Sequence, residues 1–166
     1  MINLEALNQL SVLSEKCGEL LRQNGLILAT AESCTGGWVA KAITDIAGSS
    51  QWFDRGFVTY TNISKTELLD VNPVTLTQYG AVSKEVVSEM ALGALRFSQA
   101  NISVAISGIA GPGGGSQDKP VGTVWFAWAK HGELQNAESL LFAGDRESVR
   151  FSAVLHAIQK TYEYSH

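Results

Sequence analysis

The sequence predicts an α/β fold, a single-domain α/β/α sandwich with a mixed sheet. Helical and strand-like segments alternate along the 166 residues, and no linker, repeat or low-complexity tract divides them. Short apolar runs at residues 26–30 and 102–106 are typical of buried parallel strands. The runs at residues 121–129 and 139–142 flank a turn at Gly132 and indicate an antiparallel hairpin. We therefore expect one domain over residues 1–166.

The other elements are predicted from apolar residues at helical or alternating spacing and from their boundary residues. Residues 4–23 form an amphipathic opening helix that ends at Asn24-Gly25. The later segments are, in chain order, a helix over residues 35–47, a strand over 53–60, a short helix over 63–70, a turn or partial helix over 73–80, and helices over 83–100 and 144–164.

Composition excludes several classes of protein. The chain carries 12 basic and 16 acidic side chains, a net charge of −4 and no basic run, so it does not fit a nucleic-acid groove. Any anionic partner has to be small and bound by a few placed donors. The two cysteines form no disulfide framework, and no apolar segment is long enough to cross a membrane. We expect a cytoplasmic protein without a membrane contact.

Glycine is concentrated in one place. Five of the 16 glycines lie within the eight residues 108–115, and Gly36-Gly37 follows Ser33. Glycine lets backbone approach a ligand closely, so such clusters often build sites from N–H groups. The alternative is a loose surface turn. The run matches no nucleotide-binding fingerprint, since no Gly-Lys-Ser/Thr sequence follows it.

Ser33 lies where a buried strand ends and a glycine-rich turn begins. Ligands of α/β sheets bind at the carboxyl ends of strands, and a following helix supplies N–H donors there. Ser33 is therefore a candidate nucleophile, although Ser33 or Thr35 could simply cap the helix. A helix N-terminus also lowers a thiol pKa, which makes Cys34 a second candidate, but free cysteine is more often a small buried hydrophobe.

Lys65 is the candidate base. The sequence Ser64-Lys65-Thr66-Glu67 matches a capping box, which places Lys65 in the first turn of a helix. The helix dipole and burial both lower the pKa of an amine there, as a general base requires. The alternative is an exposed surface lysine. Tyr60, at the preceding strand end, could orient this lysine, donate a hydrogen bond to a substrate, or be a core residue.

Further candidates lie near the end of the chain. Arg146 and Arg150 share a helix face after the predicted cap Asp145, a combination suited to phosphate, although ordinary ion pairs would explain them equally. Pro120 makes the Ser-x-x-Lys sequence at residues 116–119 a loop rather than a catalytic motif. A triad of Ser33 with His156 remains open. The three histidines lack zinc-ligand spacing, so no metal site is predicted.

Several motifs carry a family resemblance when taken in order. They are Ala31-Glu32-Ser33-Cys34-Thr35-Gly36-Gly37, Tyr60-Thr61-Asn62 with Lys65, Gly108-Ile109-Ala110-Gly111-Pro112-Gly113-Gly114, Lys119-Pro120-Val121-Gly122-Thr123-Val124 and Gly144-Asp145-Arg146. Over nearly the whole chain they resemble the CinA C-terminal domain family. Its stand-alone members hydrolyse the carboxamide of nicotinamide mononucleotide to nicotinate mononucleotide and ammonia. Family members more often carry threonine where this chain has Ser107.

The resemblance implies roles for particular residues. Ser33 would be the nucleophile, Lys65 its general base and Tyr60 a supporting residue, with Arg146 on the phosphate. The implied substrate-binding groups are Thr35, Gly36, Gly37, Asn62, Gly108, Ala110 and Gly111. The family needs no metal and no cofactor, and its members are expected to be homodimers. A non-catalytic nucleotide-binding or regulatory module is the rival interpretation, since glycine-rich backbone and Arg146 would serve binding equally well.

Overall fold

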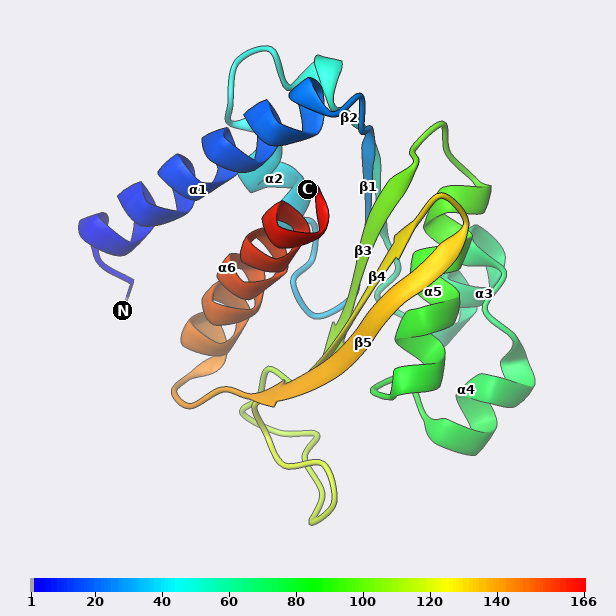
Figure 1. The fold of residues 1–166 in the computed structure, drawn as a ribbon. Helices are drawn as coiled ribbons and strands as arrows, with labels where there is room; N and C mark the ends of the chain where they lie inside the picture. Colours follow the sequence, from blue (N-terminus) through cyan, green and yellow to red (C-terminus); the bar gives the residue numbers. More distant parts are fainter. Residues whose placement is uncertain (1) are drawn as a thin grey trace.

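The structure is a computed structural model that describes residues 2–166. Its centre is a five-stranded sheet in the order β2-β1-β3-β4-β5 (Figure 1). The first three strands of that order are parallel, and β4 and β5 are antiparallel to their neighbours. The strands are β1 (Leu28–Glu32), β2 (Phe53–Val58), β3 (Ile102–Gly108), β4 (Thr123–Lys130) and β5 (Glu133–Leu141). The predicted mixed sheet and hairpin are confirmed.

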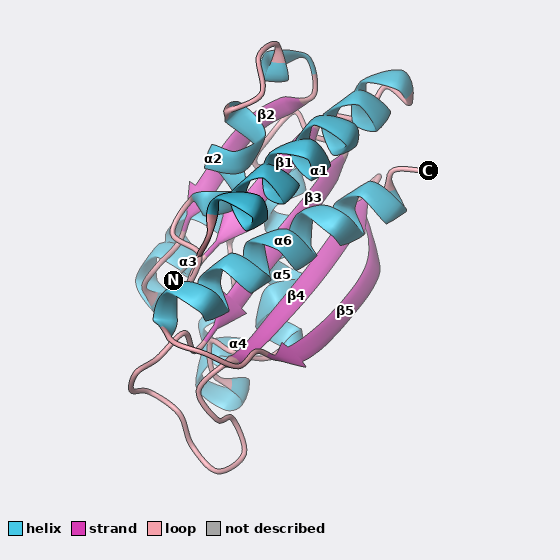
Figure 2. Cartoon of the chain, turned by 90° about the vertical axis from the view of Figure 1, so that its left-hand side faces the viewer, coloured by secondary structure: helices cyan, strands magenta, loops and turns pink. Residues whose placement is uncertain are grey.

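Helices cover both faces of this sheet. Figure 2 shows α1 and α6 lying side by side across the face that is nearest the viewer, with α2 beside them. The other three α-helices lie on the opposite face (Figure 1). The helices are α1 (Leu4–Gln23), α2 (Trp38–Thr44), α3 (Asn62–Leu69), α4 (Pro73–Tyr79), α5 (Lys84–Arg96) and α6 (Arg146–Tyr164), with a short 3-10 turn at Ser49–Gln51.

The two faces of the sheet are packed differently. Large side chains such as Phe126 and Trp128 fill the core under α1 and α6. The face toward α5 is lined largely by alanines, which let the helices come close. Gly93 of α5 faces α3, where an added Cβ would lie 2.1 Å from the carbonyl oxygen of Leu69. This close approach holds α3 and its side chains against the carboxyl ends of the strands.

The carboxyl ends of three neighbouring strands meet at one edge of the sheet. In the parallel register, Glu32 of β1 lies opposite Val58 of β2 and Ile106 of β3. The ladder continues one residue further, because the N–H of Ser33 donates to the Ile106 carbonyl and the N–H of Thr59 donates to the Glu32 carbonyl. Ser33 therefore lies between the end of β2 and the end of β3.

Some predicted boundaries are wrong. The second hairpin strand is longer than residues 139–142 and begins at Glu133, and α5 ends at Arg96 rather than near residue 100. The second helix begins at Trp38 rather than residue 35, and it ends at Thr44. Gly36 and Gly37 have φ angles of 62° and 92°, which belong to the left-handed region and not to a helix. The segment that the sequence suggested as partial helix, residues 73–80, contains the helix α4.

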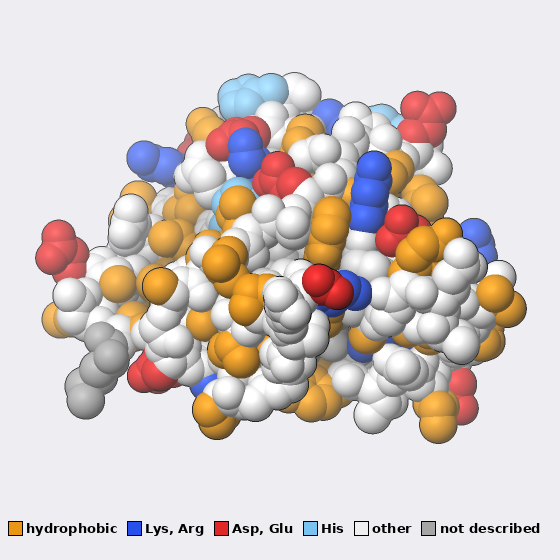
Figure 3. Space-filling model, turned by 90° about the horizontal axis from the view of Figure 1, so that it is seen from below, with side chains coloured by type: hydrophobic (Ala, Val, Ile, Leu, Met, Phe, Trp, Pro, Cys, Tyr) orange, Lys and Arg blue, Asp and Glu red, His pale blue; other side chains and the backbone are white. Residues whose placement is uncertain are grey.

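The end of the molecule at which β1 and β3 finish is seen in space-filling form in Figure 3. Hydrophobic side chains gather in the middle of this face, and lysine and arginine side chains lie singly on it. Across residues 2–166, no helix has the length and apolar character needed to cross a membrane. The same residues contain no cluster of three or more His, Cys, Asp and Glu that could hold a metal ion.

Candidate active site

Ser33 and Lys65 are in direct contact at the carboxyl edge of the sheet. The Nζ atom of Lys65 lies 3.0 Å from Oγ of Ser33 and 2.7 Å from the carbonyl oxygen of Thr59. Lys65 is 1% exposed, and this burial lowers its pKa to about 8 because a charged amine loses its hydration. A substantial fraction of Lys65 is therefore neutral near pH 8 and able to accept the Ser33 proton.

Local sequence explains how Lys65 is directed inward. The hydroxyl of Thr61 accepts from the N–H of Ser64, and Ser64 Oγ accepts from the N–H of Thr61, so these two residues form the capping box of α3. The predicted box at Ser64 to Glu67 is wrong by one turn. Lys65 is the fourth residue of α3, on the side that packs toward Ser33.

A buried carboxylate accepts hydrogen bonds from the turn after Ser33 and from the start of α2. Glu32 is fully buried, and its oxygens accept from the N–H groups of Gly37, Val39 and Ala40. The N–H of Gly36 donates to the carbonyl of Ser33. The expectation that Gly36, Gly37 and the α2 N-terminus offer free N–H donors is therefore wrong, because Glu32 satisfies that helix end.

Arg150 holds the same turn from α6. Its guanidinium donates from Nε to the carbonyl of Cys34 at 3.0 Å and from Nη2 to the carbonyl of Thr35 at 3.1 Å. It also lies 5.4 Å from the ring centroid of Trp38, over that ring. Arg150 therefore does not join Arg146 as a pair of phosphate ligands, although the two residues are one helical turn apart.

Arg146, at the start of α6, connects the segment after β2 with the glycine-rich loop after β3. Its Nη1 donates to the Gly111 carbonyl and its Nη2 to the Tyr60 hydroxyl, both at 2.8 Å. Asp145 caps α6 by accepting from the N–H of Ser148, as predicted. Tyr60 is 57% exposed and its hydroxyl bonds Arg146, so its predicted contact with Lys65 is absent. Arg146 keeps three N–H donors with no acceptor among residues 2–166.

A cavity of ≈ 220 Å³ opens at this point of the sheet. Its walls come from the ends of β1 and β3, from α3, from the turn before α5 and from the start of α6. It is lined by Ser33, Cys34, Tyr60, Asn62, Lys65, Ala81, Val82, Ser107, Gly108, Ala110 and Arg146. Ser33, Lys65 and Arg146 thus line the same cavity.

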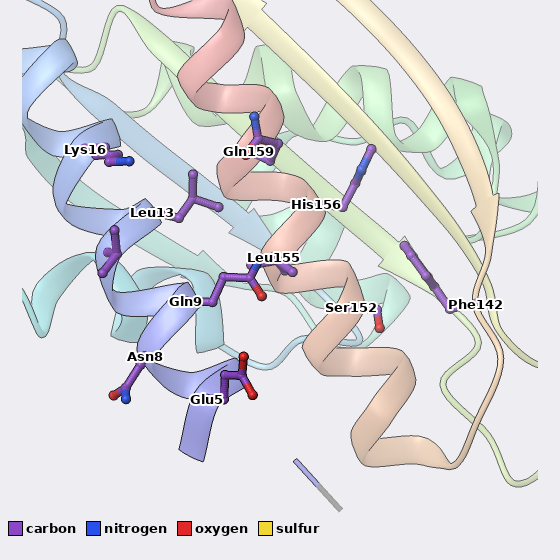
Figure 4. Close-up of a pocket in the computed structure, with 11 residues that line it drawn as sticks. Glu5, Asn8, Gln9, Leu13, Lys16, Phe142, Ser152, Leu155, His156 and Gln159 are labelled. Carbon is purple, nitrogen blue, oxygen red and sulfur yellow. The ribbon is translucent and has the colours of Figure 1, made fainter. Parts of the chain in front are cut away.

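A larger groove of ≈ 860 Å³ lies elsewhere, between α1, α6 and Phe142 (Figure 4). His156 lines this groove, and its Nε2 lies 2.8 Å from a carboxylate oxygen of Glu138. The triad of Ser33 with His156 is therefore not formed. The groove also lacks a serine or cysteine bonded to a base, so we place the chemistry in the smaller cavity.

The thiol of Cys34, next to Ser33, is protonated and therefore not in the form that acts as a nucleophile. Cys34 is 6% exposed, and burial raises its pKa to about 12. A thiol of that pKa stays protonated at neutral pH, whereas thiol nucleophiles act as thiolates. Cys34 therefore lines the cavity as a small apolar group.

The family model for the CinA C-terminal domain matches residues 10–165. The chain belongs to the CinA C-terminal domain family. It is 54% identical over 156 residues to nicotinamide-nucleotide amidohydrolase PncC of Escherichia coli K12, covering 94% of both chains. It is 57% identical over 152 residues to PncC of Enterobacter agglomerans, covering 91% of this chain and 92% of that one. A crystal structure of a CinA superfamily protein from Klebsiella pneumoniae matches with a TM-score of 0.90 at 39% identity, over 94% of this chain and 97% of that one.

The structure brings most of the residues that the CinA resemblance singles out to the cavity, and leaves four away from it. Those lining it are Ser33, Tyr60, Asn62, Lys65, Gly108, Ala110 and Arg146. Thr35, Gly36, Gly37 and Gly111 are not among the lining residues. The Gly111 carbonyl accepts a hydrogen bond from Arg146, which lines the cavity. The other three residues form the turn that follows Ser33.

Sequence reasoning missed three lining residues. Ser107 lies near the end of a buried strand, directly before the glycine run, which is similar to the signal that singled out Ser33, so it could have been found. Ala81 and Val82 carry no chemical signal, and they reach the cavity because the turn between α4 and α5 folds over the sheet edge.

Proposed function

We propose that this protein is a nicotinamide-nucleotide amidase, which hydrolyses the carboxamide of nicotinamide mononucleotide to nicotinate mononucleotide and ammonia. The contact of Lys65 Nζ with Ser33 Oγ at 3.0 Å, in a buried cavity, is the observation that carries the proposal. The names of relatives at 54% and 57% identity over more than nine-tenths of the chain supply the substrate class.

The first half of the reaction forms an ester on Ser33. Neutral Lys65 takes the proton of the Ser33 hydroxyl while Oγ bonds to the carboxamide carbon and the carbonyl electron pair moves to oxygen. The tetrahedral intermediate collapses as that pair re-forms the carbonyl and the C–N bond breaks. The leaving nitrogen takes the proton from the Lys65 ammonium and departs as ammonia.

The second half returns the enzyme to its starting state. A water molecule attacks the ester carbon and gives a proton to Lys65, which then protonates Ser33 Oγ as the C–O bond breaks. The net change is consumption of one water and one amide and release of one carboxylate and one ammonium ion, because the proton of the new carboxylic acid is taken up by the ammonia. The carbonyl of Thr59 keeps Lys65 directed at Ser33 throughout, since it accepts one N–H at 2.7 Å.

The ribose and phosphate of the nucleotide are assigned to the mouth of the cavity, near Tyr60 and Arg146. The ≈ 220 Å³ cavity suits the pyridine ring and its carboxamide, which leaves ribose and phosphate near the exposed side of Tyr60. There Arg146 offers three unused N–H donors to one phosphate. Seen this way, a net charge of −4 is compatible with a nucleotide substrate because one guanidinium is enough.

The rival function is a non-catalytic nucleotide-binding or regulatory module, which the same rim would serve. Incubation of purified protein with nicotinamide mononucleotide distinguishes the two. The amidase releases ammonia and nicotinate mononucleotide in equal amounts, whereas a binding module gives heat of binding in calorimetry and no ammonia. A panel of small amides tests the breadth of substrates. Homodimer formation and a cytoplasmic location stay predictions from the sequence.

A further inference from the structure

Ser107 occupies on β3 the position that Ser33 occupies on β1. Glu32 and Ile106 are register partners, so Ser33 and Ser107 are the next pair along the two parallel strands. Ser33 continues the face of Ala29 and Ala31, and Ser107 continues the face of Ala105, which is the face toward α5. The two serines therefore stand side by side on one face, and Lys65 approaches Ser33 from the opposite, β2 side.

The Ser107 hydroxyl is buried and unused by the protein. Ser107 is 1% exposed and lines the cavity, yet its Oγ makes no hydrogen bond to any group within residues 2–166. Ser103 lies four residues earlier on the same strand face, and its Oγ donates to the Ala91 carbonyl at 2.7 Å. Unlike Ser103, Ser107 has no such acceptor among residues 2–166, and it lines the cavity.

The reaction needs a hydrogen-bond donor for the oxyanion. The tetrahedral intermediate carries a negative oxygen, and several nearby main-chain N–H groups are already engaged: Gly36 donates to Ser33, Gly37 to Glu32 and Ile109 to Thr123. Since Lys65 serves the proton transfers from the β2 side, the oxygen has to be met from elsewhere. Ser107 Oγ lines the same cavity as Ser33 and Lys65, on the β3 side of Ser33.

We propose that Ser107 is a further catalytic residue, whose hydroxyl donates a hydrogen bond to the carboxamide oxygen as it becomes the oxyanion. The proposal rests on the amidase function above. A bond that forms fully only in the transition state affects kcat more than KM.

Three variants test it by ammonia release from nicotinamide mononucleotide. Ser107→Ala should lower kcat about 100-fold to 1,000-fold, the usual cost of one oxyanion donor, with KM within a few-fold. Ser107→Thr restores the hydroxyl and should recover most of the rate. Ser103→Ala is the matched control, because it removes a buried hydroxyl from the same strand face and should reduce stability without reducing kcat. Ser107→Ala turnover within threefold of wild type, or an equal loss in Ser107→Thr, would overturn the proposal.

A second readout does not depend on the natural substrate. A fluorophosphonate reacts when Ser33 Oγ bonds to phosphorus, fluoride leaves and Lys65 takes the hydroxyl proton, and the adduct is measured by intact mass. Ser107→Ala should label much more slowly than Ser103→Ala, because the phosphoryl oxygen is stabilised like the oxyanion. Slow labelling of Ser107→Ala in a protein that releases no ammonia would uphold Ser107 and reject the amidase. Equal labelling of both variants rejects the role of Ser107, and a wild type that neither labels nor turns over contradicts both proposals.

Discussion

The Nζ atom of Lys65 lies 3.0 Å from the Oγ atom of Ser33, although 32 positions separate the two residues in the chain. The contact exists because β1 pairs with β2 in parallel, so that the strand end before α3 lies beside the strand end that carries Ser33. The same helix packs closely against Gly93 of α5, and Lys65 is buried at the sheet edge, where it contacts Ser33 and the Thr59 carbonyl.

Replacement of Lys65 tests the base. Lys65→Met keeps the length and volume of the side chain but removes the amine, so ammonia release should fall by about 100-fold to 10,000-fold. Lys65→Arg should be as inactive, because a guanidinium does not lose its proton near neutral pH. Lys41→Met is the control, since Lys41 is exposed and pairs with Asp45 on the surface. An active Lys65→Met enzyme with native near-ultraviolet circular dichroism would rule out this base.

The rate should depend on pH with a definite sign. Burial holds the pKa of Lys65 at about 8, and the neutral amine is the active form. Ammonia release at low substrate concentration should therefore rise with pH up to about 8 and level off above it. A profile measured from pH 6 to 10 checks this. A rate that falls as pH rises through this range would mean that the reaction requires a protonated group and not the neutral amine.

Replacement of Cys34 should leave the chemistry intact. Burial raises the pKa of its thiol to about 12, so no thiolate is present at the pH of the assay. Cys34→Ala should retain kcat within about threefold while lowering the midpoint of thermal unfolding, because a buried side chain is shortened. A loss as large as that of Ser33→Ala would identify the thiol as the nucleophile.

Arg146 should act on binding of the phosphate. Arg146→Met should raise KM for nicotinamide mononucleotide about tenfold to 100-fold, the loss of about 1.4–2.8 kcal/mol expected for charge-assisted hydrogen bonds. The same variant should differ little from wild type with nicotinamide riboside, which lacks the phosphate. Arg55→Met, a change of an exposed arginine on β2, is the protein control. An equal KM increase for both substrates would instead indicate that Arg146 only shapes the rim through Tyr60 and Gly111.

Glu32 should contribute to stability through the turn that follows it. Its carboxylate is fully buried and accepts from three N–H groups at the start of α2. Glu32→Gln turns one acceptor into a donor that faces N–H groups, and should lower the free energy of unfolding by roughly 1.5–3 kcal/mol. Urea unfolding of this variant beside Glu67→Gln, an exposed carboxylate, measures the difference. Equal unfolding midpoints for both variants would contradict this role.

The sequence predicted the architecture because its periodicities are local. Apolar runs of strand length alternate with helical spacing, and those patterns alone indicate a mixed α/β sheet. The start of α2 was placed too early because Gly36 and Gly37 look like a helix opening, while their left-handed φ angles and the Glu32 contacts appear only in three dimensions. A carboxylate that caps a helix from the preceding strand leaves no local pattern.

The sequence indicated most of the residues that line the cavity, but not their burial or the hydrogen bonds between them. Ser33 and Lys65 were singled out by their places at element ends, but the burial of Lys65 depends on how closely α3 and α5 pack. Of the alternatives for Tyr60, a contact with Lys65 is not formed, because the Tyr60 hydroxyl accepts from Arg146, which is 86 residues away in the chain. Such long-range contacts follow from topology and cannot be obtained from spacing.

The most direct test of the account is the ammonia release rate of the Ser33→Ala variant beside the wild type, with nicotinamide mononucleotide as the substrate. Ser33 Oγ accepts a hydrogen bond from Lys65 Nζ and is the atom that forms the ester in the proposed mechanism, so its removal should reduce release to the level of a blank without protein. Wild type should release ammonia steadily. A Ser33→Ala protein that keeps the wild-type rate would contradict the Ser33–Lys65 mechanism.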